Sequence, residues 1–180
     1  MICRACAFET ERLLVKEWHT LSFHDWQQQE LANVVATVLT EPVTRSLPPS
    51  WQGRYTVERA REWIAERDAE GVTLLVIDKT TQQAVGLMIL FETDAEDSRD
   101  SIEVRLGYLL SEPAWGKGLA SELVSGFVNW CREHVSISSI AGGVARENSA
   151  SRRILEKNGF CRVQSEDEPV QDDQLYRLQL

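Results

Sequence analysis

Residues 103–120 decide the fold, and they read EVRLGYLLSEPAWGKGLA. Ile102, Val104 and Leu106 alternate with polar or small residues, which is the period of a half-buried strand. A proline and two glycines interrupt this pattern. Beyond them apolar residues recur at helical spacing, at Leu119, Leu123, Phe127, Val128 and Cys131. The stretch therefore predicts a strand, a tight glycine turn and a long helix.

This order places a glycine-rich turn at the N-terminus of a helix. Several backbone N–H groups at that point have no intrahelical partner, and the helix dipole is positive there. Gly116 and Gly118 carry no Cβ, so an anion can approach the backbone closely. The turn therefore favours a phosphate ligand. The alternative is a turn that needs glycine only for its dihedral angles.

Two common phosphate-binding motifs do not fit the turn. The loop of nucleotide triphosphatases needs a Ser or Thr after its lysine, but Gly118 follows Lys117. The dinucleotide motif Gly-x-Gly-x-x-Gly needs a third glycine where this chain has Ser121. A nucleotide-binding protein that uses the same turn remains the weakest of the alternatives.

Two motifs together resemble the GNAT acetyltransferase superfamily. The turn is similar to its Gln/Arg-x-x-Gly-x-Gly/Ala motif, with Trp115 in place of Gln or Arg and with Gly118 and Ala120 in register. Asn148-x-x-Ser151-x-x-x-Leu-Glu-Lys-x-Gly-Phe is similar to its C-terminal signature. The form Trp-Gly-Lys-Gly-Leu-Ala resembles the branch that includes the ribosomal-protein N-terminal acetyltransferases. The resemblance covers the chain from about Glu9 onward.

The resemblance implies an acetyl-CoA-dependent N-acetyltransferase that moves the acetyl group directly to a primary amine in a ternary complex. The turn would hold the pyrophosphate of coenzyme A, and the strand backbone would contact the pantetheine arm and polarise the carbonyl group. Asn148 would hydrogen-bond that arm, although its other interpretation is a simple helix cap. No metal is implied. The cofactor-binding residues are then Tyr108, Leu109, Leu110, Trp115, Gly116, Lys117, Gly118, Leu119, Ala120, Asn148 and Ser151.

The catalytic residues depart from the family pattern. Many relatives carry a Tyr that protonates the departing thiolate, and the matching position here is Leu155. Ser151 is the substitute acid, or merely a small residue at a helix start. Relatives commonly place a Glu where this chain has Arg105, so the candidate base is Glu103, one pleat away. Glu103 could instead pair with Arg105 or another charge, and a water chain could take the proton. A non-catalytic acyl-CoA-binding or sensor module on the same fold is therefore the alternative function.

Composition bounds these interpretations. A chain of 180 residues suits one domain, 1–180, with residues 1–8 expected to be a loose extension. No apolar run is long enough for a membrane helix, and no signal peptide is evident, so we expect a cytoplasmic protein without a membrane partner. A net charge of −9 argues against nucleic acid and suits a cationic amine acceptor. The Cys3-x-x-Cys6 pair lacks the second pair that a zinc site needs.

The remaining elements follow in order along the chain. We expect strands near residues 10–18, 74–77, 85–91, 136–144 and 175–180, and helices near 25–39, 57–69 and 149–158. Thr56 and Asn148 are expected N-caps, Glu41-Pro42 is expected to end the first helix, and the acidic residues 92–100 are expected to form a loop. The result is an α/β fold, a mixed, mostly antiparallel central sheet of about six to seven strands with helices on both faces, as in the GNAT fold.

Acceptor specificity is expected in the first two helices and the loop 47–55. Trp26, Trp51 and Tyr55 could line a pocket there. His19 and His24 are treated as surface residues, and His134 is expected to complement the dipole of the long helix. The sequence leaves the acceptor open between a protein N-terminus and a small molecule, and leaves the protein as a monomer or a homodimer.

Overall fold

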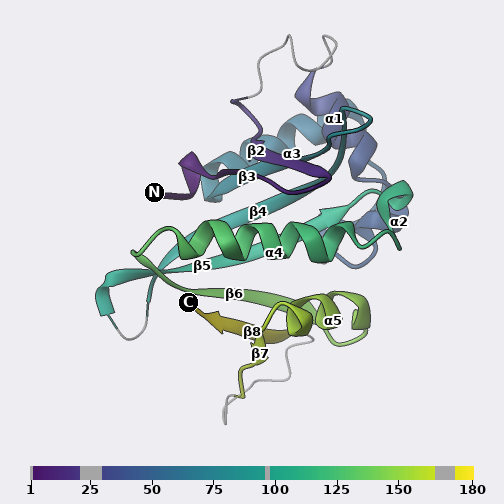
Figure 1. Ribbon diagram of the computed structural model, residues 1–180. Helices are drawn as coiled ribbons and strands as arrows, with labels where there is room; N and C mark the ends of the chain where they lie inside the picture. Colours follow the sequence, from purple (N-terminus) through teal and green to yellow (C-terminus); the bar gives the residue numbers. More distant parts are fainter. Residues whose placement is uncertain (1, 21–29, 96–97, 165–172) are drawn as a thin grey trace.

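The computed structural model describes residues 2–20, 30–95, 98–164 and 173–180 (Figure 1). Within them, eight strands form one sheet in the order β1-β2-β3-β4-β5-β6-β8-β7. The strands are β1 (Ala7–Glu9), β2 (Leu13–Glu17), β3 (Val72–Asp78), β4 (Gln83–Ala95), β5 (Ser98–Leu110), β6 (Ile137–Ala145), β7 (Cys161–Arg162) and β8 (Asp173–Gln179). The α-helices are α1 (Leu31–Val38), α2 (Glu41–Thr44), α3 (Val57–Glu70), α4 (Leu119–Arg132) and α5 (Ser149–Lys157), and the 3-10 turns are η1 (Ile2–Ala5), η2 (Pro49–Trp51) and η3 (Glu112–Ala114).

One pair of neighbouring strands is parallel in this otherwise antiparallel sheet. β5 and β6 run in the same direction, with Ile102 opposite Ile137 and Arg105 opposite Ala141. The chain reaches β6 from the end of β5 by crossing over the sheet in α4, because a parallel pair cannot be joined by a hairpin. This crossover places the start of α4 at the C-terminal end of β5.

Alternation along the strands divides the core between the two faces of the sheet. Leu106 of β5 packs in the cluster that lies under α4 and α5, whereas Leu109 packs in the cluster that lies under α1 and α3. Because successive side chains point to opposite faces of the sheet, each strand contributes residues to both cores. Figure 1 shows α4 lying lengthwise across one face of the sheet.

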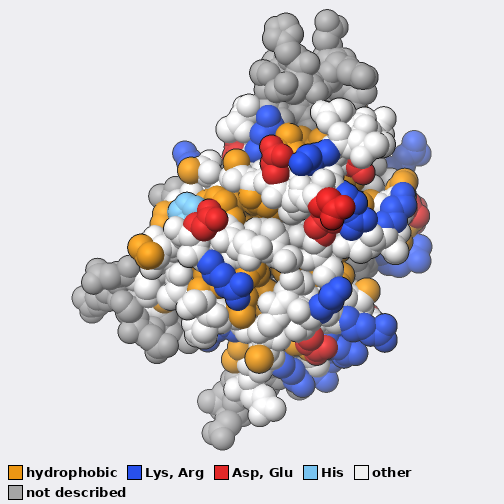
Figure 2. Space-filling view, viewed as in Figure 1, with side chains coloured by type: hydrophobic (Ala, Val, Ile, Leu, Met, Phe, Trp, Pro, Cys, Tyr) orange, Lys and Arg blue, Asp and Glu red, His pale blue; other side chains and the backbone are white. Residues whose placement is uncertain are grey.

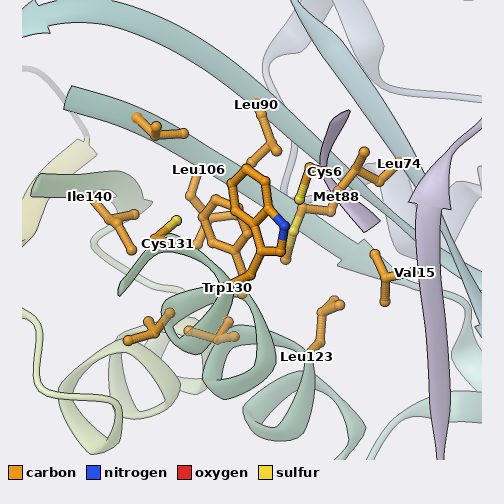
Figure 3. Packing of buried hydrophobic residues seen from close by; sticks show 14 of the residues in the cluster. Cys6, Val15, Leu74, Met88, Leu90, Leu106, Leu123, Trp130, Cys131 and Ile140 are labelled. Carbon is orange, nitrogen blue, oxygen red and sulfur yellow. The ribbon is translucent and has the colours of Figure 1, made fainter. Parts of the chain in front are cut away.

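The α4 core is densely apolar. Phe127 is fully buried and stacks on Trp130, with ring centroids 6.1 Å apart. Figure 3 shows Trp130 and Cys131 facing Met88 and Leu106 of the central strands. Burying one such large side chain stabilises the fold by about 1.5–3 kcal/mol. This packing fixes the helix, and with it the turn before Leu119, on the sheet.

The predicted fold class is confirmed, with two differences in the sheet. The sheet has eight strands rather than six to seven, because β1 and β7 contain three and two residues and are too short to show a period. The prediction of a loop at 92–100 was wrong. β4 continues to Ala95 and β5 begins at Ser98, because pairing between the two strands, such as Thr93 opposite Glu103, satisfies the backbone whatever the side-chain polarity.

The first residues of the chain also differ from the expected loose extension. Cys3 of η1 and Cys6, which follows η1, are buried in the α4 core, and the Cys3 amide donates to Glu92 Oε1 over 2.6 Å. Burial raises the pKa of both thiols, and it raises that of Cys131 to about 12. Residues 2–6 are held because they supply apolar volume at the end of α4 and a hydrogen bond to β4.

Capping residues mark some of the helix boundaries, and one predicted boundary differs. Thr56 caps α3, and its side chain accepts a hydrogen bond from the amide of Arg59. Gly159, with φ of 89°, follows α5 in the left-handed region. Residues 25–29 of the predicted first helix lie outside the described residues, and α1 begins at Leu31. Glu41 and Pro42 do not end α1 but begin α2, because proline suits the first helical turn.

Within the described residues, the helices are all too short or too polar to cross a membrane.

Candidate active site

The candidate site is the opening between β5 and β6. Pairing between these strands runs from Ile102 opposite Ile137 to Arg105 opposite Ala141 and ends there. Beyond that point β6 continues to pair with β8, and β5 continues to pair with β4 as far as Leu110. The two parallel strands therefore separate, and the last five residues of β5 have no sheet partner on their β6 side.

Tyr108 presents its backbone to this opening. The Ile102 amide donates to Ser136 on the β6 side, and the Ser111 amide donates to Val85 on the β4 side. Because alternate residues of a strand direct their N–H and C=O groups to the same side, even-numbered residues of β5 face β6. The Tyr108 N–H and C=O are thus directed into the opening. Leu109 is paired with Leu87 of β4, so its backbone is used within the sheet.

The glycine turn adjoins the end of β5. Gly116 and Gly118 have φ of 72° and 78°, in the left-handed region that favours glycine, and α4 begins immediately afterwards at Leu119. A Cβ built on Gly116 meets nothing within 4 Å, and one on Gly118 meets only Arg12 Nη2 at 3.6 Å. Within the described residues, the amides of residues 116–121 donate to no protein acceptor. The turn is therefore an open array of backbone donors at a positive helix end, which suits a diphosphate.

Trp115 differs from the other turn residues. Its amide donates to the Glu112 carbonyl over 3.0 Å, because η3 continues into it. Its indole Nε1 donates to the Leu110 carbonyl over 2.7 Å. Trp115 and Leu110 were expected to contact the cofactor through their backbones. The Trp115 amide and the Leu110 carbonyl are instead bonded within the protein, and together they fasten the turn to the end of β5.

Arg12 supports the turn, and the sequence analysis missed it. Arg12 Nη1 donates to the Lys117 carbonyl over 2.9 Å, and Arg12 Nε donates to Glu122 Oε2 over 2.7 Å. Burial of Glu122 raises its pKa, but bonds from Thr10 and from Arg12 outweigh this, so its pKa lies below the usual value. Arg12 lies more than 100 residues from the turn in sequence, so no local motif could have identified it.

The start of α5 supplies two further polar groups. Asn148 Oδ1 accepts a hydrogen bond from the Ser151 amide over 3.1 Å, so Asn148 is the predicted N-cap. In the part of the chain that the structure describes, Asn148 Nδ2 has no protein acceptor. Figure 1 shows α5 at the same end of the sheet as the start of α4, and Figure 2 shows basic side chains gathered over that end. Arg152, Arg153 and Lys157 belong to α5.

Tyr108 also places its side chain near α5. It lies partly buried against the core cluster that contains Leu106 and Leu155. Burial raises the pKa of the Tyr108 phenol, while the side chain of Ser151 acts to lower it. The phenol oxygen is buried and has no hydrogen-bond partner among the described residues. Leu155, at the position where many relatives carry Tyr, is buried, so it contributes packing alone.

Glu103 lies away from these groups. It precedes Tyr108 by five residues, about 16 Å along a strand, and faces the other side of the sheet. Ser139 Oγ donates to Glu103 Oε2 over 3.0 Å, and Arg177 Nε lies 2.7 Å from the same oxygen. The side chain is buried. The structure thus brings Tyr108, the turn and the α5 start together, and holds Glu103 in a separate ion pair.

The aromatic residues of the expected acceptor region form a cluster. Trp51 and Tyr55 pack edge-on against Trp63, with centroid separations of 5.5 and 6.3 Å. Arg67 lies over Trp51, with its Cζ 4.2 Å from the ring centroid. These rings therefore form part of the α3 core. Trp26 and His24 lie outside the described residues.

Most of the chain matches an established family. Residues 20–161 match the family model described as an acetyltransferase (GNAT) domain. The chain therefore belongs to the GNAT acetyltransferase domain family, a class of N-acetyltransferases. The resemblance expected from the turn and from the α5 motif is thereby confirmed.

Particular relatives agree with this family. The chain is 28% identical over 109 residues to an uncharacterized N-acetyltransferase, p20, of Bacillus licheniformis, a match that covers 61% of this chain and 58% of p20. A GNAT-family acetyltransferase from Bacillus anthracis has a similar structure, with a TM-score of 0.73, 19% identity and coverage of 97% and 98% of the two chains. RimL, described as a ribosomal L7/L12 alpha-N-protein acetyltransferase in complex with coenzyme A, gives a TM-score of 0.71, 13% identity and coverage of 97% and 98%. The two structural likenesses show a shared fold.

Proposed function

We propose that this protein transfers an acetyl group from acetyl-CoA to a primary amine, directly and within a ternary complex. The observation that carries the proposal is the set of unengaged amides at residues 116–121 beside the opening between β5 and β6. The diphosphate of the donor substrate fits the turn, and the extended pantetheine arm fits an unpaired strand side. RimL, which shares the fold, has been described in complex with coenzyme A.

The residues at the opening take different parts in this reaction. The amides of Gly116 to Ala120 hold the diphosphate, and the Tyr108 backbone and Asn148 Nδ2 position the pantetheine arm. When the amine nitrogen attacks the carbonyl carbon, the N–C bond forms and the C–S bond breaks. The Ser151 hydroxyl stabilises the negative charge that develops on sulfur. The proton lost by the amine finally reaches the sulfur through solvent.

Glu103 is the residue to test as the general base. It is the buried carboxylate among the described residues. Proton abstraction by Oε2 would disturb its contacts with Ser139 and Arg177. An amine that arrives neutral needs no base in this position, and alignment of the two substrates then supplies most of the rate enhancement.

The acceptor is proposed to be a protein N-terminus or a small amine. The net charge of −9 attracts cationic acceptors. RimL is described as acting on the ribosomal protein L7/L12, which favours a protein N-terminus as the first acceptor to test. A monomer and a homodimer are both compatible with a site built from one chain.

The test is a calorimetric titration with acetyl-CoA, followed by an assay of thiol release with a panel of peptides and polyamines. We expect binding, and thiol release that depends on the amine. Absence of binding at high micromolar acetyl-CoA would overturn the proposal. Binding without amine-dependent release would favour the acyl-CoA sensor instead, which the Glu103 ion pair and Leu155 make the second candidate.

A further inference from the structure

Arg105 is an exposed cation on the sheet face opposite α4. Alternate residues of a strand lie on the same face, so Arg105 shares the face of Leu109, which packs in the cluster under α1 and α3. Those helices bury Leu109, but Arg105 stays exposed. In the part of the chain that the structure describes, the Arg105 side chain makes no hydrogen bond or ion pair. A central strand therefore presents an unpaired positive charge to solvent.

The residues around Arg105 do not neutralise this charge. Glu103 lies on the same face of β5, two residues earlier, but its Oε2 atom lies 2.7 Å from Arg177 Nε, so that carboxylate is already paired. Directly beside Arg105 in the sheet lie Phe91 of β4 and Ala141 of β6, and neither carries a charge. In a chain with a net charge of −9, Arg105 is thus a local site for an anion.

Two exposed glycines leave the sheet uncovered on this face. Gly107 follows Arg105 by two residues, and a Cβ built on it would meet only Ile89, at 3.9 Å. Gly143 of β6 follows Ala141, the neighbour of Arg105, by two residues, and a Cβ built there meets nothing within 4 Å. The described residues therefore leave room for an extended chain beside the opening between β5 and β6.

In the proposed acetyl transfer, the donor substrate is held from the other face. The turn begins α4 and Asn148 caps α5, and both helices pack on the face opposite Arg105. The Tyr108 backbone lies in the plane of the sheet, in the opening itself. An amine that attacks a carbonyl group held there must approach from the face that the donor leaves open, which is the face of Arg105.

The spacing along β5 sets which part of an acceptor meets the guanidinium. Arg105 precedes Tyr108 by three residues, which is roughly 10 Å along a strand. An extended acceptor chain also rises about 3.3 Å per residue. With its α-amine at Tyr108, such a chain places its second or third residue beside Arg105.

We propose that Arg105 selects acceptor peptides that carry a carboxylate side chain at their second or third residue. This inference rests on the proposed acetyl transfer and names the chemistry of its acceptor. A guanidinium presents paired N–H donors whose geometry matches a carboxylate. The net negative charge of the protein draws the cationic α-amine, and Arg105 recognises the acidic side chain behind it. Arg105 contacts a part of the acceptor that does not react, so it determines specificity and is not a catalytic residue.

The test measures kcat and KM for neutral peptides with a free N-terminus in which one residue, the second or the third, is Asp, Asn or Lys. Acetyl-CoA is saturating. One charge-assisted hydrogen bond is worth about tenfold or more in affinity. We expect the KM for the better-placed Asp peptide to lie about tenfold below that of its Asn counterpart, and the KM for the Lys peptide to be higher still. The kcat values should be similar, because binding away from the reacting atoms acts equally on ground state and transition state. The preference should weaken as salt is added.

Two variants and one control assign the preference to Arg105. Arg105→Gln should raise the KM for the Asp peptide to that of the Asn peptide, and Arg105→Glu should invert the order in favour of Lys. Arg132→Gln is the matched control, because Arg132 is also exposed but lies in the last turn of α4, far from the opening. It should keep the preference of wild type. All three substitutions are on the surface and should leave Tm and the Kd for acetyl-CoA close to wild type.

The outcomes separate this inference from the proposed function. Equal KM values for the Asp, Asn and Lys peptides in a wild-type enzyme that turns over overturn this inference alone. An Asp preference that survives in Arg105→Gln also overturns it, because another group then recognises the carboxylate. Acetylation of free aspartate but of none of the peptides overturns it as well. A wild-type chain that binds no acetyl-CoA, or releases no thiol with any amine, overturns the proposed function and this inference with it.

Discussion

Replacing Gly116 by alanine separates the backbone role of the turn from its role as a phosphate cradle. Gly116 has φ of 72°, and an L-residue in that region costs roughly 1–2 kcal/mol of stability. For a chain of this length, 1 kcal/mol lowers Tm by about 2–4 °C, so we expect a loss of about 2–8 °C. The new Cβ meets nothing within 4 Å, so no steric clash adds to this cost.

The same Cβ enters the open space in front of the unengaged amides. Displacing a phosphate enough to lose one charge-assisted hydrogen bond costs about 1.5–3 kcal/mol. At about 1.4 kcal/mol per factor of ten, the Kd for coenzyme A should rise roughly 10- to 150-fold. The measurements are a thermal melt and a calorimetric titration of each variant.

Gly53→Ala is the matched control for Gly116→Ala. Gly53 has φ of 97°, and its added Cβ would lie 3.4 Å from Arg59 Nη1, so the variant carries a similar backbone cost away from the turn. It should lose stability and keep the affinity of wild type for coenzyme A. The reasoning is refuted if Gly116→Ala binds coenzyme A as tightly as Gly53→Ala does.

Three other predictions follow from groups outside the turn. A thiol reagent should label Cys161 quickly in the folded protein, and the other three cysteines only after unfolding, because Cys161 is exposed and the others are buried; fast labelling of more than one thiol would contradict the packing of η1. Glu103→Ala should lower the free energy of unfolding by about 3 kcal/mol in a urea titration, because it removes the buried carboxylate that pairs with half-buried Arg177, and a loss below 1 kcal/mol would argue against the ion pair. The pKa of Glu122 lies below its ordinary value, so its contribution to stability is present above about pH 4.5 and is lost as pH falls through the lowered pKa; Glu122→Gln should remove that part of the acid dependence of Tm, and an unchanged profile would contradict it.

Local patterns predicted the central elements because each carries its own signal. The strand before Leu110 alternates with a period of two, α4 shows a helical period, and Thr56 caps α3 as a threonine at that position should. Repeated spacing and turn chemistry act within a few residues, so the sequence shows them directly.

The errors arose where distant contacts decide the structure. The loop at 92–100 was predicted from composition alone, but residues 92–95 pair with residues of β5. Cys3 and Cys6 are ordered by packing against α4, which lies more than 100 residues away. Both the strand pairing and the cysteine packing depend on contacts that exist only once the chain has folded.

The site also combines features that local sequence predicted with features that depend on distant residues. The glycine turn and Asn148 were found from spacing, because backbone conformation and capping impose residue types locally. Arg12 was missed because its bond to the Lys117 carbonyl joins the residue before β2 to a turn that is distant in the sequence. The partners of Glu103, Ser139 on β6 and Arg177 on β8, likewise come from other strands, so its separation from Tyr108 was hidden in the sequence.

The most direct test of the central claim is an amide NMR titration of the labelled protein with coenzyme A and, in parallel, with pantetheine, which lacks the diphosphate. The account predicts that coenzyme A shifts the amide signals of Gly116, Lys117 and Gly118 downfield, as expected for donors that gain a phosphate acceptor, and that pantetheine leaves them in place. Saturable binding of coenzyme A that leaves these three signals unmoved would contradict it.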